Sequence, residues 1–282
     1  MNNSLQKLIL KLAGIGALLA ACAQTVLYLI GYDEALHLYE RDFSLPGLIY
    51  GVFFLLISAG FVFFCLQKKD SLPTEIGRVD RTCAFFSLFS GILLLAAAVY
   101  NVMRILDTPP EIPSTIRIFA LAMTIPAACY FIASAWIAKP SRPLTSLLGM
   151  FVLCWLALYL MSVYFELDSS LKSPERILRQ LGLALLMVHF LYEIRYLLGI
   201  PMPRLYFATG CAAILMVGLS ALPDAVVTLL QKRAITDNSM FSLTMTAMGL
   251  YIFARMLSTL RGEAMEFSPA EEAAPEEEAA DE

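Results

Sequence analysis

The residues of this 282-residue chain that could do chemistry are the few ionisable ones set inside long apolar segments. His189 and Glu193 are four positions apart, so in a helix they share one face. An imidazole beside a carboxylate could relay protons or hold a cationic ligand. The structural alternative is that Glu193 reaches the lipid headgroups from near the end of its segment, or pairs with Arg255 of a later one. Both interpretations stay open.

A second candidate is the dipeptide Pro223-Asp224. Proline inside a helix removes a backbone hydrogen bond and kinks the helix, and a carboxylate beside such a break can form an ion site between membrane spans. Alternatively, the helix ends near Leu222 and Asp224 caps a short helix that follows it. The remaining polar and hinge candidates at membrane depth are Gln24, Asn101 and Pro126.

The elements that must position these residues follow from the composition. Hydrophobic residues make up 59% of the chain and charged residues 16%, against about 45–50% and 25% in a soluble domain. An apolar segment of about 20 residues crosses the membrane as a helix, since backbone groups facing hydrocarbon must be satisfied internally. We therefore predict an all-α polytopic transmembrane bundle over 1–262, with no soluble domain. Its spans cover about 8–30, 46–66, 83–106, 115–138, 143–165, 175–198, 203–222 and 239–260.

Basic residues in the loops indicate the orientation. Twelve of the 20 Lys and Arg residues fall on the side of the N-terminus and eight on the other, which favours both termini inside. The segment 263–282 has nine acidic residues and no basic one, and it has too few large apolar groups to fold. We expect a disordered acidic tail in the cytoplasm. The expected location is a bacterial cytoplasmic membrane.

Several kinds of chemistry find no support in the residue pattern. The six cysteines lie in or beside apolar segments without metal-ligand spacing, so we interpret them as packing residues. The chain has two histidines, and it lacks a phosphate-binding loop, a zinc-binding helix motif and a nucleophile elbow. We expect no metal, no cofactor and no nucleic acid. The expected partner is the lipid bilayer. The small residues of the first span suit close helix contact, within the chain or in a homodimer.

These observations favour a non-enzymatic integral membrane protein that handles a small amphiphilic ligand or acts as a sensing or assembly subunit. One alternative is a secondary transporter in which His189, Glu193 and Asp224 face one cavity. Another is an intramembrane lipid-modifying enzyme that uses Asp224 or Glu193 as acid or base. The discriminating observation is whether the three side chains converge.

Overall fold

A computed structural model describes residues 3–33, 38–39, 45–66, 72–107, 114–137, 141–165, 173–230, 237–261 and 265. Over these residues the chain forms eight long helices and one two-residue strand pair. The helices are α1 (Asn3–Gly31), α2 (Leu45–Leu66), α3 (Arg81–Asp107), α4 (Ser114–Trp136), α5 (Arg142–Tyr164), α6 (Pro174–Leu197), α7 (Pro203–Leu229) and α8 (Asp237–Arg261). Strand β1 (Tyr32–Asp33) pairs antiparallel with β2 (Leu38–Tyr39).

All eight helices are long and apolar enough to cross a membrane, which confirms the predicted all-α polytopic bundle. Most helix ends lie within two residues of the expected ones. The exceptions are α1, which begins five residues earlier, and α7, which continues through Pro223 to Leu229. Asp224 therefore lies inside α7 and does not cap a separate helix.

The helix starts follow from proline and from capping side chains. Pro174 and Pro203 are the first residues of α6 and α7, where the missing N–H has no intrahelical partner. Ser141 precedes α5, and its hydroxyl accepts from the Leu144 N–H. After α6 the chain turns at Gly199, whose φ of +78° favours glycine.

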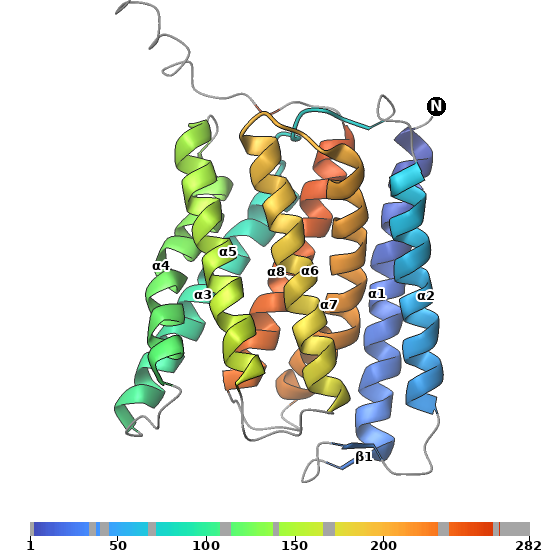
Figure 1. Cartoon of the computed structure of the whole chain (residues 1–282), viewed down its shortest axis with the longest axis vertical. Coiled ribbons are helices and arrows are strands. Elements are labelled where there is room, and N and C mark those ends of the chain that lie inside the picture. Colours follow the sequence, from blue (N-terminus) through green and yellow to red (C-terminus); the bar gives the residue numbers. More distant parts are fainter. Residues whose placement is uncertain are drawn as a thin grey trace, which may run out of the picture.

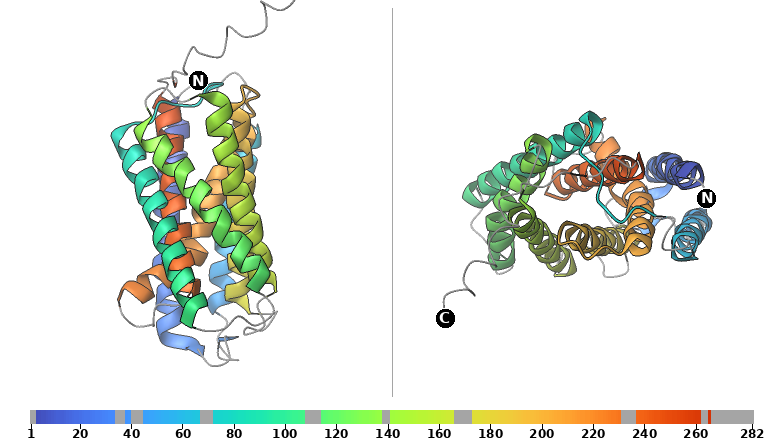
Figure 2. Two further views of the ribbon diagram at one scale, coloured as in Figure 1. Left: turned by 90° about the vertical axis from the view of Figure 1, so that its left-hand side faces the viewer. Right: turned by 90° about the horizontal axis from the view of Figure 1, so that it is seen from above.

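Six helices form a closed ring. Successive helices from α3 to α8 pack against each other, and α8 packs back against α3. Helices α1 and α2 lie outside this ring against α7, at the blue side of the bundle in Figure 1 and in the end-on view of Figure 2. As a result α7 is the most buried of the eight spans and α2 the most exposed. The hydrophobic core lies inside the ring and continues between the ring and α1.

Small residues allow α1 to approach α7 closely. A Cβ atom added at Gly218 of α7 would lie 2.5 Å from the Ala17 carbonyl oxygen of α1, far inside van der Waals contact. Within the described part of the chain, the small-residue face predicted for the first span therefore packs against α7 of the same chain. The large apolar residues of α1 that point outward are exposed, including Leu8, Leu12 and Leu19.

The start of α1 and the end of α8 lie at the same end of the bundle, the upper end in Figure 1. An even number of crossings requires this arrangement. The acidic segment 263–282, which we expected to be disordered, lies outside the described residues except for Met265. Met265 is buried, and its backbone N–H donates to the Ile76 carbonyl at 3.0 Å.

Candidate functional site

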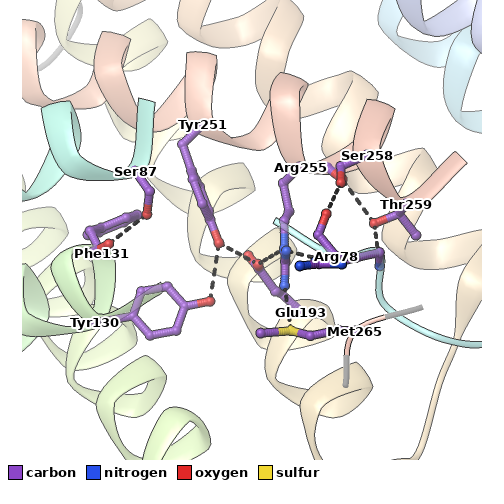
Figure 3. Close-up of polar contacts among 11 residues, drawn as sticks. Arg78, Ser87, Tyr130, Phe131, Glu193, Tyr251, Arg255, Ser258, Thr259 and Met265 are labelled. Atoms are coloured by element: carbon purple, nitrogen blue, oxygen red, sulfur yellow. Dashed lines mark hydrogen bonds and ion pairs between the residues drawn. The ribbon is translucent and has the colours of Figure 1, made fainter. Parts of the chain in front are cut away.

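An ion pair lies in the interior of the ring, near the end where α8 finishes at Arg261. Nε of Arg255 on α8 is 3.5 Å from Oε1 of Glu193 on α6, and both side chains are almost fully buried. Helices α6 and α8 are not neighbours in the ring. The two long side chains therefore meet across its interior, as Figure 3 shows.

Two tyrosines extend this pair. The Tyr251 hydroxyl donates to Oε1 of Glu193 at 2.7 Å, and the Tyr130 hydroxyl of α4 lies 3.5 Å from that of Tyr251. Tyr251 and Arg255 are four residues apart, so α8 presents both from one face. One carboxylate oxygen thus receives a phenol and a guanidinium, which is the kind of pairing that a charge in an apolar interior requires.

The ion pair connects to the chain segment between α2 and α3. We call the described part of that segment, 72–80, the strap. Nη1 of Arg255 donates to the Gly77 carbonyl at 2.8 Å, and Nη2 contacts Sδ of Met265 at 3.4 Å. The Gly77 N–H in turn donates to Oγ1 of Thr259 at 3.1 Å. Figure 3 shows Arg255 between Glu193 and the strap.

The strap is fixed at further points. The Tyr196 hydroxyl of α6 donates to the Pro73 carbonyl at 2.8 Å, and Ser258 of α8 donates to the Arg78 carbonyl. Asp80 forms an ion pair with Arg261 and accepts from the Cys83 N–H at the start of α3. The strap therefore spans from α6 to α8 over this end of the ring.

Several buried polar atoms near the ion pair have no hydrogen-bond partner among the described residues. They are Nδ1 and Nε2 of His189, Oε2 of Glu193, the Tyr206 hydroxyl and Nε of Arg255. The His189 and Tyr206 rings pack with their centroids 4.8 Å apart. We call Glu193, His189, Tyr206 and Arg255 the Glu193 cluster. Buried polar groups normally have partners, and an ionisable group at membrane depth indicates a functional site.

Aromatic rings surround the Glu193 cluster and keep its environment apolar. Phe190 stacks on Tyr251 at 6.2 Å between centroids, and Phe131 packs edge-on against Tyr251 at 5.2 Å. On the other side, Tyr196 packs against Tyr206 at 4.9 Å. Electrostatic interactions in such surroundings are stronger than in water.

The structure brings together three of the predicted site residues, His189, Glu193 and Arg255, and leaves the others elsewhere. Asp224 is buried in α7, 18 residues beyond Tyr206 and hence about 27 Å along the helix. Gln24 donates to the Tyr50 hydroxyl at 3.1 Å, between α1 and α2. Asn101 is half-buried near the end of α3. Both hinge candidates, Pro126 in α4 and Pro223 in α7, lie inside helices.

The participants that were not among the predicted site residues include Tyr130, Tyr206, Tyr251, Gly77, Thr259 and Met265. Tyr251 carried a usable signal, because its four-residue spacing from Arg255 repeats that of His189 from Glu193. No feature of the sequence around Gly77 indicated that it would contact the site. Its contacts join positions more than 170 residues apart in the chain.

Within the described part of the chain, no group of three His, Cys, Asp or Glu side chains could hold a metal ion. The six cysteines are free. Comparison with family models, with curated proteins and with solved structures finds no match. The fold and the site define the class as a multi-pass helical membrane protein with an ion pair in its interior.

Proposed function

We propose that this protein is a non-enzymatic, multi-pass protein of a bacterial cytoplasmic membrane that holds a small amphiphilic ligand as a sensing or ligand-handling subunit. The observation that carries the proposal is the Glu193 cluster, where a carboxylate oxygen, an imidazole and a phenol lack hydrogen-bond partners among the described residues. A ligand head group with hydrogen-bond donors and acceptors would satisfy these atoms, and its apolar body would match the surrounding rings.

The charge of the site favours a neutral head group. Glu193 and Arg255 already balance each other at 3.5 Å. A charged ligand would leave a net charge in an apolar interior, which costs several kcal/mol. An alcohol, amide or similar neutral group would not. The proposed orientation places both termini in the cytoplasm, so the strap and the Glu193 cluster would lie toward that side.

The arrangement supports ligand holding over the two alternatives. A transporter site built from His189, Glu193 and Asp224 would require convergence, and Asp224 lies about 27 Å from the Tyr206 level along α7. An acid–base enzyme would require an oriented pair. The imidazole of His189 makes no hydrogen bond to Glu193 in the described structure.

Native mass spectrometry of protein extracted in a non-denaturing detergent tests the proposal. We expect wild-type protein to retain a neutral molecule of a few hundred daltons, and Glu193→Gln and Tyr206→Phe to lose it. Asp224→Asn is the matched control, since it removes a buried carboxylate remote from the cluster, and it should retain the molecule. Wild-type protein that carries no such molecule, or cluster variants that keep it, would contradict the proposal.

Two further readouts separate the alternatives. Conversion of a membrane lipid by purified wild-type protein, abolished in Glu193→Gln, would indicate an enzyme. Ion-coupled flux in proteoliposomes that needs both Glu193 and Asp224 would indicate a transporter.

A further inference from the structure

The strap closes the end of the ring above the Glu193 cluster. Leu72 and Ile76 are buried, while Pro73 is held by α6 and Gly77 by α8. The end-on view in Figure 2 shows the chain before α3 crossing over the ends of the helices. Access to the cluster from this end therefore requires the strap to move.

One stripe of α8 connects the cluster to the strap. Tyr251, Arg255 and Thr259 are spaced by four residues and lie on one helix face. Tyr251 bonds to the interior side, at Oε1 of Glu193 and, at 3.5 Å, at the Tyr130 hydroxyl. Thr259 bonds to the strap side, at the Gly77 N–H. Arg255 lies between them and contacts both sides.

Gly77 makes this close contact possible. A Cβ atom at this position would lie 2.5 Å from the backbone nitrogen and Cα of Thr259. The strap backbone thus rests directly on α8, where the Gly77 carbonyl can reach the Arg255 guanidinium. The adjacent Ile76 carbonyl accepts from the Met265 N–H, so Met265 is held at the same place.

The Glu193 carboxylate is the anion with which the buried Arg255 guanidinium is paired. A buried guanidinium that loses its anion is strongly destabilised. Its long side chain can then recover hydration of the charge by extending toward water at the membrane surface. The strap lies at that surface. Such a movement would change the bond to the Gly77 carbonyl, which is one of the bonds that hold Gly77 to α8 among the described residues.

We infer that the strap is a lid over the Glu193 cluster, and that Arg255 couples its closure to the state of the Glu193 carboxylate. When Glu193 is charged and paired, Arg255 holds the strap and Met265 in place. When this pair is broken, Arg255 is released and the strap opens on the face that carries the start of α1 and the end of α8. This coupling between Glu193 and the strap does not rest on the proposed ligand site.

Amide hydrogen exchange of the full-length protein in detergent tests the coupling. Among the described residues Glu193 contacts Tyr251 and Arg255 and not the strap, so we expect an effect of Glu193→Gln on the strap to pass through Arg255. We expect Glu193→Gln to accelerate exchange of the peptide covering 72–80 at least ten-fold. Asp224→Asn, the matched control, should leave that peptide unchanged. Thr259→Val, which removes a direct bond to Gly77, is the positive control and should also accelerate it.

Peptides from the interior of α7 serve as the reference for global folding. If Glu193→Gln accelerates exchange there as well, the same comparison is made with Glu193→Asp, which keeps the charge but withdraws it from Arg255. Strap exchange equal to wild type in a folded Glu193 variant would overturn the inference. Retention of the neutral molecule is scored separately by mass spectrometry. Coupling without a bound molecule would refute the proposed function alone, and a bound molecule without coupling would refute the lid alone.

Discussion

We predict how much the ion pair between Glu193 and Arg255 contributes to the free energy of unfolding. The closest nitrogen and oxygen are 3.5 Å apart, which corresponds to a Coulomb attraction of about 5 kcal/mol at an effective dielectric constant of about 20. Desolvation of the two charges offsets part of this attraction. Removal of one partner nevertheless leaves the other buried and unpaired, at a typical cost of about 3–5 kcal/mol.

A double-mutant cycle isolates the pair. We expect Glu193→Gln and Arg255→Met each to lower the free energy of unfolding by about 3–5 kcal/mol. The double variant should lose less than the sum by about 2–3 kcal/mol. Arg255→Met also removes the contacts with Gly77 and Met265, but that loss occurs with or without Glu193 and cancels in the cycle to first order.

Steric trapping in bicelles measures these free energies without leaving the membrane-like environment. Gln at position 193 keeps an acceptor for the Tyr251 hydroxyl, so the cycle reports the charge and not that hydrogen bond. Additivity of the two single variants within about 0.5 kcal/mol, the usual behaviour of independent sites, would refute the argument that the pair acts as a unit.

Three further predictions follow from the packing, the hydrogen bonds and the charge pattern. Gly218→Ala should destabilise the protein by about 1–3 kcal/mol through overpacking against α1. Gly51→Ala, at a position with nothing within 4 Å, should be neutral or stabilising by up to about 1 kcal/mol; equal unfolding curves for the two variants would count against the close contact. Tyr251→Phe should cost about 1–2 kcal/mol, as it removes the 2.7 Å bond to Glu193, and no change in the same assay would contradict that bond. Compartment reporters fused to the two termini should both read the cytoplasm, and opposite readings would exclude an even number of crossings.

The helices could be predicted from the sequence because lipid constrains them more strongly than water constrains a soluble fold. A chain that crosses hydrocarbon must satisfy its own backbone, so runs such as 46–66 and 143–165 have no other regular structure open to them. The ends were less well defined. Pro223 could end a helix or be absorbed by it, and burial of the following turn against the bundle, seen in Val227 and Thr228, accompanies the continuation to Leu229.

The candidate site was predictable only in part. The spacing of His189 and Glu193 identified a polar face, and Arg255 was identified as a possible partner for Glu193, because charges are rare at membrane depth. Asp224 satisfied the same criterion, yet it lies far from them. Hydropathy locates a residue within its own span and gives no information about which spans are neighbours.

The sequence by itself determined that this chain crosses a membrane eight times as helices, and which residues are costly to bury there. Local composition is sufficient for both, since the cost of transfer to lipid depends on each residue and on its helix. Only the tertiary structure decided that α6 and α8 face each other across a ring, that Arg255 lies between Glu193 and the strap, and that Gly77 rests on Thr259. Those contacts join residues between 62 and 182 positions apart in the chain, and only the packing of all the helices together brings them within bonding distance.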